Sequence, residues 1–147
     1  MKAENYVTLE FLSRSANEGF ARMAAASFAA QLDPTLDEIG DIKTAVSEAV
    51  TNAIVHGYRG REDGLVRMSA EYGDRRLLTV VIRDEGCGIA DVEKAMQEGY
   101  STAGPTAREL GFGAGMGLPN MKKYSDEMEV ISEVGVGTTV NMKVYVA

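Results

Sequence analysis

One short stretch, SEAVTNAIVHGY at residues 47–58, carries three polar side chains that could do chemistry. Glu48, Asn52 and His56 follow one another at intervals of four residues. With about 3.6 residues per helical turn, side chains at this spacing lie on one face of a helix. The apolar residues between them form a second stripe, which we expect to pack in the core. The polar face therefore either meets water or lines a site.

The first two residues of this polar stripe suit proton transfer and the binding of a hard metal ion. A carboxylate such as Glu48 can accept a proton. The amide oxygen of Asn52 is a ligand that Mg²⁺ can take together with phosphates and water. A zinc site is poorly supported, because His56 is the only histidine and Cys87 the only cysteine. We expect His56 to cap or pack at the helix end, and Cys87 to take no part in the chemistry.

A second candidate segment, RDEGCGI at 83–89, directly follows a strongly apolar stretch. The Asp84 carboxylate can accept a hydrogen bond from an exocyclic amine, and Gly86 and Gly88 would let the backbone approach a planar ligand. The alternative is a plain turn, since Asp and Gly are common turn residues. The segment 135–139 is typical of a β-turn before a strand, and a hydroxyl there gains interest only if it meets Asp84.

The segment GFGAGMG at 111–117 has a glycine at every second position and leads into an expected helix. Small residues expose consecutive backbone N–H groups, and a helix start adds partial positive charge, so this segment could cradle a phosphate. It lacks the features of the dinucleotide fingerprint and of the P-loop. A flexible linker is the alternative. The wider segment 99–117 is long for a simple connection, which favours a mobile functional loop.

A strand and two long helices are predicted in the first part of the chain. Residues 6–12 alternate well enough for a strand. Both helices open with the capping-box spacing, in which a hydroxyl and a carboxylate three residues on satisfy free backbone donors. We expect these helices from Ser15 to about Leu32 and from Thr35 to about Gly57, with a break at Pro34.

Strands dominate the rest of the chain. They are predicted at 65–72, 77–82, 129–132 and 138–146, with a short helix over 89–98 and another over 118–124. Helices from the start combined with strands from the middle and end favour an α+β two-layer sandwich.

Composition narrows the class of protein. The 147 residues suit one domain, and a formal charge of −7 argues against a nucleic-acid binder. One cysteine excludes an internal disulfide and fits a reducing compartment. The N-terminus has no apolar run suited to a signal peptide, and no stretch reaches the roughly 20 residues of a membrane span. We therefore expect a cytoplasmic protein without a membrane partner.

Four short boxes occur in the order found in the GHKL ATPase superfamily of gyrase, histidine kinases and MutL, and the chain resembles that superfamily. The boxes are Glu48-x-x-x-Asn52, Asp84-x-Gly86-x-Gly88, Gly113-x-Gly115-x-Gly117 and Gly137-Thr138. Nearly the whole chain is similar to the small serine kinases and anti-sigma factors of Gram-positive bacteria, most closely those of sporulation, through residues 15–58 and 84–89. A histidine kinase is disfavoured, because no separate helical hairpin carries a phospho-accepting histidine.

The resemblance implies a fold and a role for each box. The fold would be a single domain over residues 1–147, a mostly antiparallel sheet covered by helices on one face. Asn52 would bind Mg²⁺ and Glu48 would act as general base. Asp84 would read the adenine amino group with support from Thr138, and the glycine box would hold the phosphates under a lid at about 99–117. The residues implied to bind ATP are Asn52, Asp84, Gly86, Gly88, Arg108, Gly113, Gly115, Gly117 and Thr138.

The lid departs from the pattern of the sporulation proteins. It is richer in glycine, and Arg108 stands further from the glycine core. Similar glycine runs also occur in kinases of stress-response modules that bind no sigma factor.

The leading hypothesis is an ATP-dependent protein-serine kinase that phosphorylates an anti-anti-sigma partner of the STAS type and sequesters a sigma factor. The resemblance also implies a homodimer, joined through the N-terminal strand and first helix. One alternative is a nucleotide-gated partner-switching protein without phosphotransfer; another is a stress-module serine kinase that binds no sigma factor. A small interaction domain whose motifs are coincidental is the third. Glu48 favours an enzyme, since a pure binding module needs Asn52 but no base.

Overall fold

Five strands form one antiparallel sheet in the computed structural model, which describes residues 3–96 and 117–147. Every neighbouring pair of strands is antiparallel. The spatial order is β1 (Asn5–Leu12), β2 (Leu65–Tyr72), β3 (Leu77–Asp84), β5 (Gly137–Tyr145) and β4 (Glu127–Glu133). The predicted α+β class with a mostly antiparallel sheet is confirmed.

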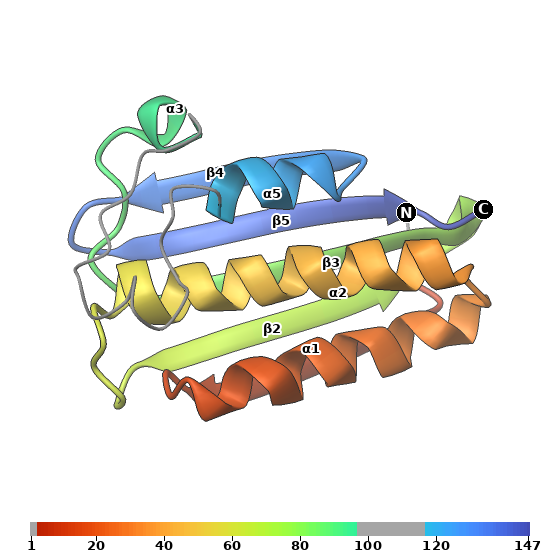
Figure 1. The fold of residues 1–147 in the computed structure, drawn as a ribbon, viewed down its shortest axis with the longest axis horizontal. Helices are drawn as coiled ribbons and strands as arrows, with labels where there is room; N and C mark the ends of the chain where they lie inside the picture. Colours follow the sequence, from red (N-terminus) through yellow and green to blue (C-terminus); the bar gives the residue numbers. More distant parts are fainter. Residues whose placement is uncertain (1–2, 97–116) are drawn as a thin grey trace.

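Helices α1 (Ala16–Ala29), α2 (Leu36–Thr51) and α5 (Gly117–Lys123) cover one face of this sheet (Figure 1). The shorter elements are α3 (Val92–Ala95), the 3₁₀ turns η1 (Ala30–Leu32) and η3 (Asp74–Arg76), and the π-helical segment η2 (Asn52–Gly57). None of the described helices has the length and apolar character needed to cross a membrane.

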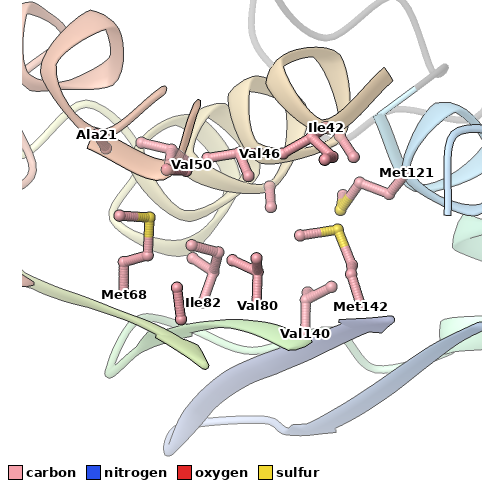
Figure 2. Packing of buried hydrophobic residues seen from close by; sticks show 14 of the residues in the cluster. Ala21, Ile42, Val46, Val50, Met68, Val80, Ile82, Met121, Val140 and Met142 are labelled. Atoms are coloured by element: carbon pink, nitrogen blue, oxygen red, sulfur yellow. The ribbon is translucent and has the colours of Figure 1, made fainter. Parts of the chain in front are cut away.

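The core lies between the helices and the covered face of the sheet. On β2, Val66, Met68 and Ala70 are buried and alternate with exposed Leu65 and Arg67, as expected when successive side chains point to opposite faces. In Figure 2 the helical side chains lie over those of the sheet. The helical residues labelled there are Ala21, Ile42, Val46, Val50 and Met121, and those of the sheet are Met68, Val80, Ile82, Val140 and Met142.

The capping box predicted at the start of α2 is present. The Glu38 N–H donates to Thr35 Oγ1 at 3.1 Å, and the Thr35 N–H donates to Glu38 Oε1 at 2.8 Å. Two of the free donors of the helix start are therefore satisfied by side chains. This contact fixes the start of the helix that carries Glu48 and Asn52.

The capping box predicted at Ser15 is wrong. Ser15 has helical backbone angles, φ −58° and ψ −30°, and its side chain makes no capping hydrogen bond. The Glu18 carboxylate instead accepts a hydrogen bond from Ser47 of α2 and pairs with Arg22 at 3.3 Å. The Glu18 carboxylate, which the sequence spacing predicted would cap α1, is thus used in a contact between α1 and α2.

Two other helices differ from their predicted form. The helix expected to end near Gly57 does reach that residue, but its last six residues are π-helical. The helix expected over 89–98 is limited, among the described residues, to Val92–Ala95. Its predicted first turn is absent because the Ile89 N–H donates to Ser132 Oγ at 2.7 Å, while the Asp91 side chain caps the helix by accepting from the Lys94 N–H.

Candidate nucleotide-binding site

Asp84 is a buried carboxylate at the end of β3, with 4% of the residue exposed. The Gly86 N–H donates to its Oδ1 at 2.9 Å, and the backbone N–H of Thr138 donates to the same carboxyl group. Burial raises the pKa of Asp84 to about 6, and the two backbone donors oppose that rise. The sequence alternative of a plain solvated turn does not fit a carboxylate buried in this way.

Thr138 lies directly opposite Asp84, on β5, and is equally buried. Its Oγ1 is 2.8 Å from the Oγ of Ser132 on β4. The Ser132 hydroxyl donates to the carbonyl of Gly137 at 3.1 Å and accepts from the Ile89 N–H. Since a hydroxyl has only one proton to give, Thr138 is the donor to Ser132. The threonine thus meets Asp84 through its backbone, while its hydroxyl is fixed by a serine that sequence reasoning missed.

Gly86 and Gly88 permit close contacts within the protein itself. A Cβ on Gly86 would lie 2.1 Å from the carbonyl oxygen of Gly57, and a Cβ on Gly88 would lie 2.3 Å from that of Glu133. Gly88 also has a φ of +76°, which favours glycine. The Cys87 N–H donates to the Gly57 carbonyl at 2.8 Å. These contacts join the loop after β3 to the end of η2 and to the β4–β5 hairpin.

His56 and Cys87 also lie at this junction. The Cys87 thiol contacts the His56 carbonyl oxygen at 3.0 Å. Burial and the nearby Arg59 lower the pKa of the half-buried His56. Within the described part of the chain no group of three or more His, Cys, Asp or Glu side chains could hold a metal ion.

Asn52 begins the π-helical segment η2 and is 8% exposed. Segments of this kind are rare and frequently occur at functional sites. Asn52 is buried where α2 passes into η2, four residues after Glu48. Its side-chain amide offers an oxygen of the kind that Mg²⁺ accepts as a ligand.

Glu48 lies half-buried one turn before Asn52 and faces the start of α5. A Cβ on Gly117, the last residue of the predicted glycine box, would lie 3.7 Å from Glu48 Oε2. The Asn120 side chain hydrogen-bonds to the Glu48 carboxylate. Burial raises the pKa of Glu48, and the charge of Glu18 adds to the rise, while the Asn120 hydrogen bond opposes it. The structure therefore brings Glu48 of the first box to Gly117, the last residue of the third box.

The two ends of the site are separated along one helical axis. Gly57 contacts Asp84, since a Cβ on Gly57 would lie 2.9 Å from Asp84 Oδ1. Gly57 lies nine positions after Glu48, a spacing on the order of 10 Å along the axis of α2 and the π-helical η2. An elongated ligand could therefore meet Asp84 at one end and Glu48 at the other. Arg108, Gly113, Gly115 and most of the predicted lid lie outside the described residues.

Comparisons with known proteins identify the family of the chain and its fold. The family model of the histidine kinase-like ATPase domain matches residues 11–144. The RsbU and RsbW domains of a Mycobacterium tuberculosis protein share the fold with a TM-score of 0.68 at 17% identity, over 97% of this chain and 32% of that chain. The histidine kinase domain of a blue-light activated kinase from Erythrobacter litoralis gives a TM-score of 0.58 at 22% identity, over 88% of this chain and 61% of that chain.

Full-length relatives are closer in sequence. The anti-sigma F factor of Clostridium beijerinckii is 50% identical over 141 residues, which cover 96% of this chain and 94% of that protein. The anti-sigma F factor of Halalkalibacterium halodurans is 49% identical over 139 residues, which cover 95% of this chain and 91% of that protein. The chain therefore belongs to the histidine kinase-like ATPase family and, within it, to the family of the anti-sigma F factors.

Proposed function

We propose that this protein is an ATP-dependent serine protein kinase and anti-sigma factor, which phosphorylates an anti-anti-sigma protein and sequesters a sigma factor. Its membership of an ATPase family and its anti-sigma F relatives support this function. The observation that carries the catalytic part is the position of Glu48, a half-buried carboxylate beside Gly117 and one turn from Asn52. A protein that only binds nucleotide needs no proton acceptor there.

Asp84 would hold the adenine end of ATP. Its ionised carboxylate can accept a hydrogen bond from the exocyclic amine, and its own position is fixed by the Gly86 and Thr138 N–H groups. Thr138 is in turn fixed by Ser132. The carboxylate therefore meets the ligand with little loss of side-chain freedom, which favours affinity.

Asn52 and Glu48 would act at the phosphate end. The amide oxygen of Asn52 fits a Mg²⁺ ligand, and such an ion would neutralise phosphate charge. Glu48 would take the proton of the substrate serine as its oxygen bonds to the γ-phosphorus and the bond to ADP breaks. The raised pKa of Glu48 makes it a stronger proton acceptor than an exposed carboxylate.

Partner binding is proposed from the relatives and from exposed apolar residues. The relatives are named for acting against a sigma factor, and we extend that role to this chain, with a STAS-type protein as the phosphorylated partner. Tyr6 on the edge strand β1 is 71% exposed and Phe20 on α1 is 58% exposed. These side chains support a homodimer joined through β1 and α1.

The catalytic proposal is tested with a pair of substitutions on one helix face. Glu48→Gln keeps the size of the side chain but accepts no proton, so nucleotide affinity should persist while single-turnover phosphotransfer falls by roughly 10²–10⁴-fold. Asn52→Ala should weaken Mg²⁺-dependent nucleotide binding and phosphotransfer together. Glu71→Gln, an exposed carboxylate change on β2, is the control and should alter neither.

Two outcomes would overturn parts of the proposal. Phosphotransfer by Glu48→Gln at the wild-type rate would remove the general-base role. The absence of phosphotransfer by the wild-type protein, with ATP-dependent capture of partners retained, would instead establish a nucleotide-gated binding protein. Pull-downs from the native cell with ATP and with ADP identify those partners. Recovery of an anti-anti-sigma protein without any sigma factor would support the stress-module alternative.

A further inference from the structure

α5 meets α2 at the Glu48 carboxylate through two of its residues. Gly117 approaches Glu48 Oε2 with no side chain between them, and the Asn120 amide hydrogen-bonds to the carboxylate. Leu118 and Met121 of the same helix are buried in the core, where Met121 lies over the sheet (Figure 2). Because these apolar contacts anchor α5, Asn120 is held in place opposite Glu48.

Asn120 is a neutral donor in a setting that otherwise disfavours the charge on Glu48. Burial and the Glu18 carboxylate both act against ionisation of Glu48. Arg22 pairs with Glu18 at 3.3 Å. A side-chain amide can donate to a carboxylate without giving up a proton. It therefore orients the oxygen atoms of Glu48 while leaving them able to accept a proton.

We infer that Asn120 is a positioning residue for Glu48, which holds the carboxylate against the start of α5 and thereby sets the rate of phosphotransfer. This inference rests on the proposed function, because it takes Glu48 as the proton acceptor. Reacting groups held in the correct geometry contribute strongly to rate, and small displacements are costly. Asn120 is therefore expected to affect phosphotransfer through Glu48 and to leave nucleotide affinity almost unchanged.

A double-mutant cycle between Asn120 and Glu48 tests the inference, with single-turnover phosphotransfer at saturating ATP as the readout. Asn120→Ala should slow phosphotransfer about tenfold in the wild-type background, the effect that loss of one hydrogen bond to a charged group supports. In the Glu48→Gln background the same change should alter the rate by less than about twofold, since the group on which it acts has gone. Calorimetry should give the wild-type affinity for ATP in both backgrounds.

Two further variants separate positioning from a general structural role. Asn120→Asp keeps the size of the side chain but replaces the donor with a carboxylate, so it should slow phosphotransfer at least as much as the alanine change. Lys122→Ala alters an exposed residue of the same helix and should leave the rate unchanged. Unfolding in urea should show that every variant remains folded under the assay conditions.

The failure of this inference can be distinguished from that of the proposed function. A slow Glu48→Gln variant together with Asn120→Ala and Asn120→Asp at the wild-type rate would overturn the role of Asn120 alone. A tenfold loss from Asn120→Ala in both backgrounds would also overturn it, because the residue would then act independently of Glu48. Glu48→Gln at the wild-type rate would remove the proposed base, and the positioning role would fall with it.

Discussion

Asp84 and Thr138 are cross-strand partners on β3 and β5, and the backbone N–H of Thr138 donates to the Asp84 carboxyl group. This pairing follows from the antiparallel register, so the threonine at the start of one strand necessarily faces the aspartate at the end of the other. Both residues are buried on the helix-covered face of the sheet. Asp84 is therefore a titratable carboxyl group in a fixed, buried position, and its ionisation should affect both nucleotide affinity and stability.

Nucleotide affinity should weaken as the pH falls through about 6, the pKa of Asp84 in the ligand-free protein. The ionised carboxylate accepts from an amine, whereas the protonated group has lost part of that capacity. Asp84→Asn should bind more weakly than wild type at about pH 7.5, and its affinity should depend much less on pH between about pH 5 and 7.5, because it has no carboxyl group to titrate in that range. Calorimetry with ATP at several pH values measures both effects. An equal pH dependence in the two proteins would exclude Asp84 as the titrating group.

The stability of the ligand-free protein should also depend on pH through Asp84, but in the opposite direction, so that stability falls as the pH rises. The pKa of Asp84 is raised from 3.8 to about 6 on folding, so the folded state holds the proton more tightly than the unfolded state. The contribution of Asp84 to the unfolding free energy is therefore greatest below pH 3.8 and declines as the pH rises to about 6. At 1.36 kcal/mol per pKa unit, the decline amounts to about 3 kcal/mol.

Urea unfolding of wild type and Asp84→Asn at a series of pH values checks this dependence. The asparagine variant should gain stability relative to wild type as the pH increases from about 3 to 7, an interval that brackets the two Asp84 pKa values of 3.8 and about 6. A constant difference between the two proteins over this interval would show that burial does not perturb the Asp84 pKa.

Ser132→Ala should lower the unfolding free energy by about 1–3 kcal/mol, because it removes the partner of the Thr138 hydroxyl and of the Ile89 N–H. Nucleotide affinity should fall as well, since Thr138 then loses its support. Urea unfolding and calorimetry measure the two effects. Ser69→Ala, on the opposite face of the sheet, is the control and should change stability by less than about 0.5 kcal/mol. Equal losses from both serines would contradict the role assigned to Ser132.

Thr35→Ala and Ser15→Ala should differ, although both residues open helices with the same sequence spacing. Thr35 makes both hydrogen bonds of a capping box, so its loss should cost about 1 kcal/mol of unfolding free energy. Ser15 makes no capping hydrogen bond, and its substitution should cost a few tenths of a kcal/mol at most. A loss for Ser15→Ala as large as that for Thr35→Ala would show that the hydroxyl caps α1 in solution.

Local sequence patterns predicted most helices and strands and the four sequence boxes. The features that they missed depend on tertiary packing. Apolar residues alternate along β2, because one face of the sheet is buried, whereas β3 was predicted from an almost continuous apolar run. The cap at Ser15 failed because Glu18 is used by Ser47 and Arg22, a contact between helices that spacing within one helix cannot reveal.

The missed residues of the site have the same explanation. Ser132 and Asn120 belong to none of the four boxes, and each reaches the site only through the pairing of β4 with β5 or the docking of α5. A serine opposite a threonine on adjacent strands becomes visible only once the register is known. The end of the π-helical segment 52–57 likewise contacts the loop at Cys87, which lies about thirty residues further along the chain and which no local pattern could have placed there.

The continuous backbone from Glu48 to Gly57 makes the site intolerant of changes in chain length. One residue inserted or deleted between them would rotate Glu48 by about 100° relative to Gly57. Either Glu48 would then leave Gly117 and Asn120, or Gly57 would leave Asp84. A change of length at residues 74–76, in the exposed turn between β2 and β3, would disturb the hydrogen bonds of Arg76 to Leu32 and Val146 but would leave the register from Glu48 to Gly57 intact. The helix segment, in contrast, must keep its residue count for the two ends of the site to face one ligand.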